Sequence, residues 1–299
     1  MKRIERISIL FTVVFASGLL IFATSYESKD KLDKEKAYVS LYFPVTANFA
    51  GEATPLKISD VKERLDRELI VNINLHASTI LAIKRANRAF PVIEPILKEN
   101  GIPDDFKYLA VIESGLVNAV SGAGARGVWQ FMPETAKERG MEVNDIVDER
   151  YDLEKSTRAA CSYFLSAKAK FGTWTLAAAS YNGGMAGVNR QMDIQKESNY
   201  YDLLLTEETS RYVFRILALK EIMKNPVKYG FTIAFEDLYA ALPTRKIEID
   251  SSITDLAIFA KSEGINYKIL KIHNPWLRET KLRNDTGKKY QIEIPLKGY

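Results

Sequence analysis

The sequence predicts a mainly α protein, an all-helical domain followed by a small module of strands and helices. Between Ser59 and Pro226, apolar residues recur at helical spacing and no stretch alternates convincingly like a strand. After Tyr229 the pattern changes, because residues 246–249 and 290–295 alternate as strands do, around two short helical segments. The order strand, helix, helix, strand predicts a separate βααβ module.

The helices follow from apolar spacing and from the residues that begin or end them. Ser59, Thr173 and Thr206 are expected to cap helices, Pro103 to open one and Gly172 to end one. We expect helices over residues 59–73, 80–88, 92–99, 103–115, 129–137, 152–170, 174–182 and 206–225, and in the module over 253–262 and 267–274.

Composition and charge narrow the class of protein. The 299 residues suffice for two domains, and 46% hydrophobic with 27% charged residues is typical of a folded globular protein. The net charge of +4 is too small for the basic stripe of a nucleic-acid-binding protein, but it suits an anionic polymer as substrate. The single cysteine, Cys161, excludes an internal disulfide and is expected to be a buried thiol.

The N-terminus predicts export. Lys2, Arg3 and Arg6 precede an apolar run, and charged residues follow it, so residues 1–25 are typical of a signal peptide or a membrane anchor. A buried core helix is the alternative, which the basic flank disfavours. No clear cleavage site is present, which favours an uncleaved anchor. We therefore expect a protein of the periplasmic cell envelope, anchored by this segment or released by cleavage.

The rest of the chain divides into three predicted parts. Residues 26–58 are expected to be a tether, because charged residues, Pro, Gly and Thr are mixed there without a sustained period. Residues 59–229 are expected to form the helical domain, and residues 230–299 the βααβ module.

Glu113 is the candidate acid/base. It follows an apolar stretch, Leu109 to Ile112, and lies at the C-terminal end of its predicted helix. Apolar surroundings and the negative end of the helix dipole both disfavour a carboxylate, so we expect its pKa to be raised. A general acid working near neutral pH needs such a shift. Taken alone, however, a glutamate near a helix end is usually a solvated surface group.

The motifs around Glu113 change this interpretation. Glu113-Ser114-Gly115 is followed by Ser121 to Pro133, SGAGARGVWQFMP, and by Ala179 to Gly184, ASYNGG. In this order they resemble the lytic transglycosylases of glycoside hydrolase family 23, whose pattern reads E-S, S-x-x-G-A-x-G-x-x-Q-x-M-P and A-x-Y-N-x-G. Ser180 stands where alanine is frequent. Further matches make residues 59–226 similar to the membrane-bound lytic murein transglycosylase D group: Gly101-Ile-Pro, Val147-Asp-Glu-Arg-Tyr-Asp and Glu208-Thr-x-x-Tyr212-Val.

The resemblance implies a lysozyme-like fold and peptidoglycan glycan strands as substrate. Glu113 would protonate the glycosidic oxygen between N-acetylmuramic acid and N-acetylglucosamine, and then act as base on the muramic C6 hydroxyl to close a 1,6-anhydro ring. No second catalytic carboxylate is needed, unlike in the usual glycosidase scheme. No cofactor is implied, and the distant His76 and His273 do not suggest a metal site. The implied substrate-binding residues are Ser121, Gln130, Met132, Tyr181, Asn182, Glu208 and Tyr212.

Several alternatives stay open. The same bond could be hydrolysed, as goose-type lysozymes of related fold do, or the chain could be a wall-binding protein without activity. The loop at Ser121 could be only a turn, residues 181–183 only a helix stop, and Glu208 only a partner of the helix dipole. Four charged residues are expected to form structural ion pairs or caps rather than to catalyse: Asp148, Glu149, Arg150 and Asp152.

The C-terminal module resembles a diverged LysM repeat, a fold that binds glycans containing N-acetylglucosamine. The matching segments are residues 253–260, 270–275 and 292–295. The usual Gly-Asp before the first helix is replaced by Asp250-Ser251-Ser252. Glycan binding and a purely structural role therefore both remain open for this module.

Overall fold

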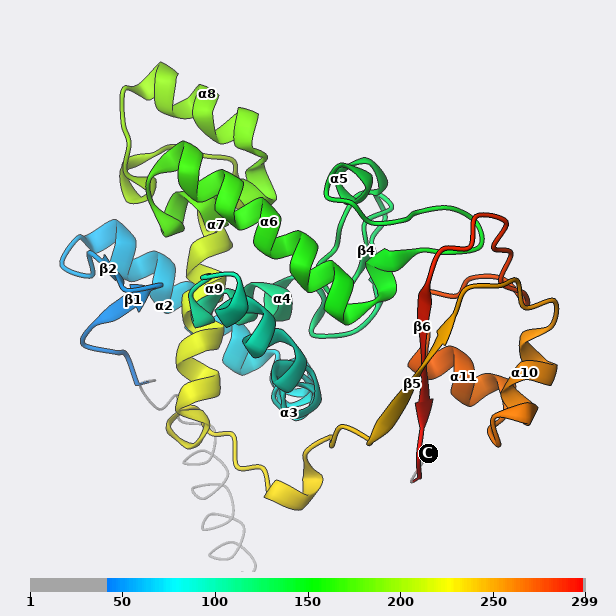
Figure 1. Cartoon of the computed structure of the whole chain (residues 1–299). Helices are drawn as coiled ribbons and strands as arrows, with labels where there is room; N and C mark the ends of the chain where they lie inside the picture. The colour runs from blue at the N-terminus through cyan, green and yellow to red at the C-terminus, as the bar shows by residue number, and fades with distance from the viewer. Residues whose placement is uncertain (1–41, 298–299) are drawn as a thin grey trace, which may run out of the picture. The chain divides into compact units, whose positions relative to one another are not determined.

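The computed structural model describes residues 42–297. From Phe43 onward these residues form one folded unit, in which a group of helices is followed by a small module of strands and helices (Figure 1). The predicted membrane segment, residues 1–25, lies outside the described residues. Among the helices that are described, none is long and apolar enough to cross a membrane.

A short β-hairpin begins the folded unit. β1 (Ala47–Phe49) and β2 (Glu52–Thr54) pair antiparallel. Phe49 is fully buried, and its ring lies 5.0 Å from that of Phe106. These residues fall within the predicted tether but belong to the core. Strands of three residues are too short to show an alternating pattern, so they could not be predicted from the sequence.

The helices of the main body surround a common core, with α7 at its centre. Residues 175–180 of α7 are all buried, and this helix packs against α6, α8 and α9. A helix that is apolar on all sides needs such a central position. In chain order the helices are α2 (Ser59–Asn74), α3 (His76–Glu99), η1 (Asp104–Phe106), α4 (Lys107–Ser114), α5 (Pro133–Glu138), η2 (Glu149–Tyr151), α6 (Leu153–Phe171), α7 (Trp174–Gly183), α8 (Met185–Gln195), η3 (Tyr200–Asp202), α9 (Glu207–Lys224), η4 (Pro226–Tyr229) and η5 (Phe235–Asp237).

Most of the predicted helix ends are confirmed. Thr173 and Thr206 each accept a hydrogen bond from the backbone N–H three residues later, and Gly172 ends α6 with a φ of 75°. Ser59 is an exception, because it lies inside the first turn of α2 and its hydroxyl donates to Glu63.

Helix α3 is continuous, whereas the sequence analysis divided this stretch into two helices. Pro91 and Pro95 lie inside it, and each lacks the backbone N–H that an interior helical residue donates. The helix nevertheless continues, because Ile93 and Leu97 are buried in the core together with the alanines that precede them. Tertiary packing here outweighs the local cost of proline.

The prediction of an all-α domain is wrong in one place. Strands β3 (Ala119–Val120) and β4 (Arg126–Gly127) pair antiparallel, so a small hairpin interrupts the helices. The helix expected over residues 129–137 begins only at Pro133. Gln130 has a φ of 51°, which is incompatible with a right-handed helix.

Helix α8 was not predicted. The expected stop after Asn182 is confirmed, because Gly184 has a φ of 71°, but a new helix begins directly at Met185. Only Val188 of α8 is buried. A helix that buries one residue gives little apolar periodicity in the sequence.

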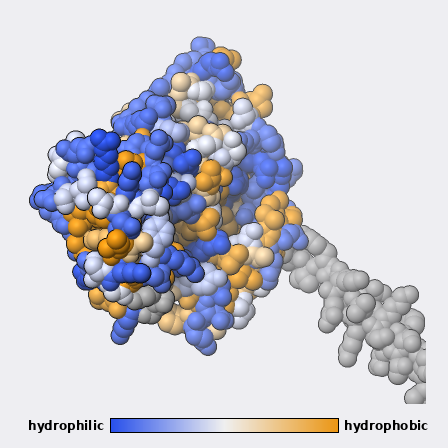
Figure 2. All heavy atoms as spheres, turned by 90° about the vertical axis from the view of Figure 1, so that its right-hand side faces the viewer, coloured by the Kyte–Doolittle hydropathy of each residue, from blue (hydrophilic) through white to orange (hydrophobic). Residues whose placement is uncertain are grey.

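The C-terminal module has the predicted βααβ order: β5 (Thr244–Ile249), α10 (Leu256–Ser262), α11 (Tyr267–His273) and β6 (Tyr290–Pro295). The two strands pair antiparallel, and the helices pack beneath them over buried leucines and isoleucines. Figure 2, which views the molecule from the side of this module, shows apolar residues interspersed with hydrophilic ones.

Candidate active site

Glu113 lies in the last turn of α4, half-buried at the edge of the core. The residues before it in the helix are buried, which fixes the helix in place. Gly115 follows in the left-handed conformation, with a φ of 61°, and turns the chain away. The hydroxyl of Tyr212, from α9, donates a hydrogen bond to the Glu113 carboxylate. The candidate acid is therefore held between two helices that are distant in sequence.

Burial raises the pKa of Glu113 to about 6, from an ordinary value of 4.5. The hydrogen bond from Tyr212 and the positive charge of Arg215 lower the pKa, whereas the negative charge of Glu208 raises it. The predicted upward shift is thus confirmed, with burial as its main cause. A carboxyl with this pKa is protonated in a useful fraction of molecules near neutral pH, as a general acid requires.

Two arginines bind the C-terminal end of the helix that carries Glu113. Arg215 donates to the carbonyl of Ile112 at 2.9 Å, and Arg85 donates to the carbonyl of Gly115 at 3.1 Å. Carbonyls at a helix end lack intrahelical partners and form the negative end of the helix dipole. Neither arginine was predicted as a site residue, because a single arginine on an amphipathic helix is normally assigned to the solvent-exposed face.

The loop after Glu113, residues 119–131, is held by hydrogen bonds within itself; we call it the hairpin loop. The Ser121 hydroxyl accepts from the backbone N–H of Ala125 at 3.0 Å. The side-chain amide of Gln130 donates to the carbonyls of Ala119 and Gly127 at 3.1 and 2.7 Å. The amide nitrogen of Gln130 therefore closes the loop, a task additional to the sugar contact that the resemblance implies.

Further hydrogen bonds tie the end of the hairpin loop to the helices. The Ser114 hydroxyl donates to the carbonyl of Val128 at 2.8 Å, and the Tyr181 hydroxyl donates to that of Trp129 at 2.7 Å. Trp129 is itself fully buried, and its indole N–H donates to Thr157 at 2.9 Å. Trp129 is thus a core residue.

Asn182 connects α7 to the start of α9. Its side chain donates to Glu208 at 2.9 Å and accepts from the Thr209 hydroxyl at 2.7 Å. The adjacent Gly183 is packed so closely that a Cβ there would lie 2.9 Å from the Thr209 methyl group. Among the described contacts it is Tyr212, rather than Asn182, that bonds Glu113.

A pocket of about 360 Å³ brings together four of the expected substrate-binding residues: Gln130, Met132, Tyr181 and Asn182. Met132 is 43% exposed, so its thioether is accessible at the rim. The other lining residues are Phe131, Thr135, Glu138, Arg139, Tyr163, Gly184 and Met185. Four expected site residues do not line this pocket: the candidate acid Glu113, and Ser121, Glu208 and Tyr212.

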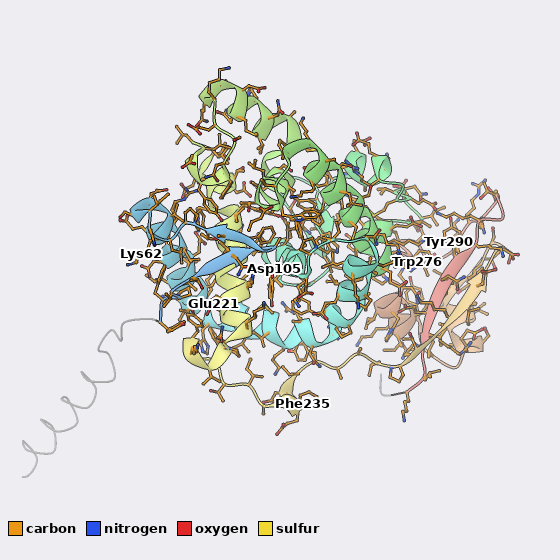
Figure 3. The ribbon with its side chains drawn as sticks, turned by 60° about the vertical axis from the view of Figure 1, so that its left-hand side comes forward. Lys62, Asp105, Glu221, Phe235, Trp276 and Tyr290 are labelled. Carbon is orange, nitrogen blue, oxygen red and sulfur yellow. The ribbon has the colours of Figure 1, made fainter. Side chains whose placement is uncertain are left out.

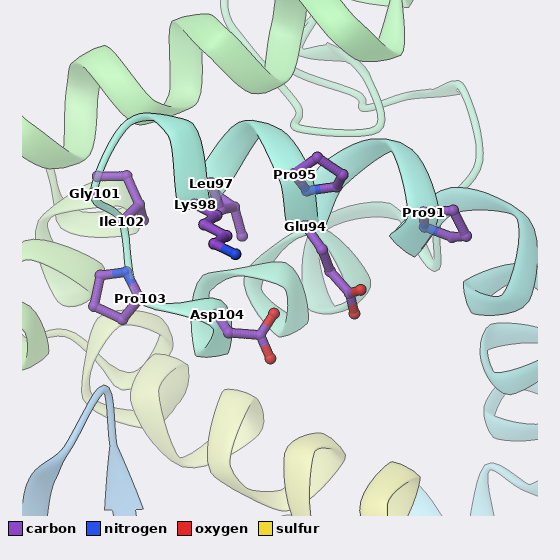
Figure 4. A pocket seen from close by; sticks show the side chains of 9 residues that line it. All are labelled: Pro91, Glu94, Pro95, Leu97, Lys98, Gly101, Ile102, Pro103 and Asp104. Atoms are coloured by element: carbon purple, nitrogen blue, oxygen red, sulfur yellow. The ribbon is translucent and has the colours of Figure 1, made fainter.

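A larger pocket, of about 740 Å³, lies between the end of α3 and η1 (Figure 4). This is the end of α4 opposite to Glu113. Both acidic residues that line it, Glu94 and Asp104, form ion pairs with Lys107, at 2.7 and 2.6 Å. Despite its size, this pocket contains none of the residues expected to act on substrate.

Three of the four charged residues expected to be structural, Asp148, Glu149 and Arg150, are buried behind the hairpin loop. Asp148 and Arg150 are 1% and 3% exposed and form an ion pair at 2.8 Å. Asp152 accepts from the backbone N–H of Lys155 and so caps α6. No group of three or more His, Cys, Asp or Glu side chains in the described part of the chain could hold a metal ion.

Two family models match the sequence. Residues 90–204, which include Glu113 and the pocket, match the Transglycosylase SLT domain, and residues 245–298 match the Soluble lytic transglycosylase C-terminal LysM-like domain. The chain contains an SLT domain and a LysM-like domain. Both resemblances that the sequence analysis drew are thereby confirmed, as is a mainly helical fold with a small C-terminal module.

The chain is also similar in sequence to curated proteins. Membrane-bound lytic murein transglycosylase D of Escherichia coli K12 is 29% identical over 258 residues, which cover 83% of this chain and 55% of that protein. The protein of the same name from a second Escherichia coli strain gives the same values. The chain thus spans about half the length of the curated relatives that it matches.

The chain also resembles a solved structure, that of an inactive Glu-to-Gln mutant of lytic transglycosylase Slt from Pseudomonas aeruginosa. The matched region covers 50% of this chain and 26% of that chain. Its sequence identity is 22% and its TM-score is 0.36.

Proposed function

We propose that this protein is a peptidoglycan lytic transglycosylase. It cleaves the β-1,4 bond between N-acetylmuramic acid and N-acetylglucosamine and leaves a 1,6-anhydro ring on the muramic acid. The observation that supports this most is Glu113, a half-buried carboxyl in an SLT domain, whose pKa is raised to about 6 and which Tyr212 holds beside the hairpin loop.

Glu113 acts in both steps of the proposed reaction. As the protonated acid it donates its proton to the glycosidic oxygen, and the bond to the muramic C1 breaks. As the carboxylate it accepts the proton of the C6 hydroxyl while that oxygen bonds to C1, so the proton returns to Glu113. Tyr212 and Arg215 stabilise the carboxylate that exists between the two steps, because both favour the charged form.

The substrate supplies the nucleophile, so a second catalytic carboxylate is not required. Glu208 is the other acid whose charge affects Glu113, and it is already engaged with Asn182. We assign Glu208 to holding the groove, together with Asn182. The pocket residues Gln130, Met132 and Tyr181 contact the sugars, and Ser121 offers its hydroxyl hydrogen to them, since the oxygen already accepts from Ala125.

We place this activity in the cell envelope, where the peptidoglycan substrate lies. The basic residues and the apolar run at the N-terminus favour export and retention at the membrane. The relatives named above are membrane-bound, which supports the same location.

Mass spectrometry of the muropeptides released from purified sacculi by the full-length protein in mild detergent tests this proposal. Products that are one water lighter than hydrolytic fragments would establish the anhydro ring. Products with free reducing ends would instead identify a muramidase, with Glu208 as the first candidate for its second carboxylate. If a folded protein released no products, the wall-binding alternative would replace the enzyme.

A further inference from the structure

The LysM-like module is attached to one segment of the SLT domain, residues 142–151, which we call the docking segment. The backbone N–H of Asp148 donates to the carbonyl of Trp276 at 2.9 Å, and that of Arg278 donates to Ile146 at 2.8 Å. Val147 and Leu277 form an antiparallel bridge between the two. The contact therefore includes main-chain pairing of the kind that joins strands in a sheet.

Apolar side chains from both sides form one buried cluster at this contact. Val147 and Tyr151 of the docking segment are 1% and 6% exposed and pack with the leucines and isoleucines of the module. Trp276 stacks on Tyr290, with ring centroids 5.6 Å apart, on the side of the module that faces the helices (Figure 3). Both rings are buried, so neither is available to stack on a sugar at this face.

Polar contacts surround this buried cluster. Lys288 of the module forms ion pairs with Glu142 and Glu149 at 2.6 and 3.2 Å. The Tyr290 hydroxyl lies 3.0 Å from Glu142 and donates to it. Lys246 adds an ion pair with Glu154, at 2.7 Å. The arrangement of an apolar centre and a polar rim is typical of a specific protein interface.

The docking segment in turn supports the hairpin loop. The carboxylate of Asp148 binds Arg150, whose guanidinium donates to the carbonyls of Gly124 and Phe131 at 3.2 and 3.1 Å. Gly127 lies so close to this segment that a Cβ would come within 1.8 Å of the Arg150 carbonyl oxygen. Asp148 therefore links the module to the loop. Its backbone N–H bonds the module, and its side chain bonds Arg150, which supports the hairpin loop.

The hairpin loop depends on such support. Its strands have two residues each, far fewer than a hairpin needs to be stable alone, and Gln130 holds a left-handed backbone conformation. A small displacement of groups that position a substrate can lower a rate by orders of magnitude.

We infer that the LysM-like module has a second task besides any contact with the wall: it fixes the docking segment and, through Asp148 and Arg150, the substrate-binding hairpin loop. This inference rests on the proposed function only in so far as the hairpin loop binds substrate. The module is then a positioning element of the catalytic site, and its loss lowers turnover of substrates too short to reach any glycan site on the module.

The test uses the full-length protein with the double substitution Lys288→Ala and Tyr290→Phe, which removes the contacts of these two side chains to Glu142 and Glu149 and leaves the apolar centre intact. The matched control is Lys289→Ala, because Lys289 pairs with Glu248 inside the module at 2.8 Å. Two quantities are measured: turnover of a short soluble peptidoglycan tetrasaccharide, and amide hydrogen exchange in residues 119–131.

We expect the double variant to exchange faster in the hairpin loop and to lose roughly fivefold in kcat on the tetrasaccharide, while the control matches the wild type. Wild-type exchange and kcat in a Lys288→Arg variant that keeps the native Tyr290 would support the contact further. Unchanged exchange and unchanged kcat would overturn the inference. A loss confined to intact sacculi would also overturn it, since the module would then act only as a glycan tether. If the wild type itself cleaved nothing, the proposed function would fail, and hydrogen exchange would still decide whether the module holds the loop.

Discussion

The two sides of the candidate site are held in different ways. On one side Glu113 sits on α4, between long helices, and its position follows from the packing of a large core. On the other side the hairpin loop has little regular structure and depends on a few buried polar contacts, chiefly those of Arg150. We therefore expect substitutions at the acid to affect chemistry and leave the fold intact, whereas substitutions behind the loop should affect both.

The largest effect is expected at the acid itself. Glu113→Gln should lower the rate of anhydro product formation by about a thousandfold or more, because it removes the proton donor and acceptor. Folding, followed by circular dichroism, should be retained. Glu94→Gln, in the pocket at the other end of α4, is the matched control and should keep its activity. Comparable losses in both variants would remove the distinction between the two ends of the helix.

The next largest effect is expected behind the loop. Asp148→Asn leaves Arg150 buried without its charged partner, which should cost about 3 kcal/mol of unfolding free energy. Activity should fall as well, unlike for an ordinary core defect of similar cost. Denaturant unfolding measures the loss of stability, and turnover measures the loss of activity. Asp60→Asn, in an exposed pair with Arg64, serves as control and should change stability by less than about 0.5 kcal/mol.

At Glu113, in contrast, a substitution that lowers activity should raise the stability of the fold. Folding raises the pKa of Glu113 from 4.5 to about 6. Ionisation of this carboxyl therefore costs more free energy in the folded state than in the unfolded state, and so lowers the free energy of unfolding. The penalty is absent below about pH 4.5, grows as the pH rises through 6, and reaches about 2 kcal/mol above that. Glu113→Gln should therefore unfold at higher denaturant than wild type at pH 7.5. At pH 4 the two should coincide, and a gain independent of pH would contradict this account.

A smaller effect is expected at Tyr212. Its hydrogen bond favours the Glu113 carboxylate, so Tyr212→Phe should raise the pKa of Glu113 above 6 and move the alkaline limb of the pH–rate profile to higher pH. The rate at the optimum should fall roughly tenfold, since the carboxyl also loses a partner that orients it. Tyr201→Phe, which removes a hydroxyl bonded to Thr54, is the control. A loss of rate without movement of the limb would limit Tyr212 to a structural role.

The sequence predicted the helical side of the site better than the loop side. The helix end beside Glu113 and the caps at Thr173 and Thr206 could be predicted because local patterns specify them. The strands β3 and β4 could not, because two residues carry no periodicity. The missed contacts have a common physical cause. Arg85, Arg215 and the docking of the module join parts that are distant in sequence, and only the folded chain brings them together.

The exposed thioether of Met132 makes the pocket open to oxidation. It is the most exposed methionine among the described residues, and it lies at the rim of the pocket. Oxidants would convert it to a sulfoxide, which is polar and chiral and which methionine sulfoxide reductases can reverse. Treatment with dilute peroxide should therefore lower activity in a way that such a reductase restores, and Met132→Leu should resist it. An equal loss in that variant would direct attention to the less exposed methionines. The exposure of this one side chain thus makes the pocket sensitive to its redox environment.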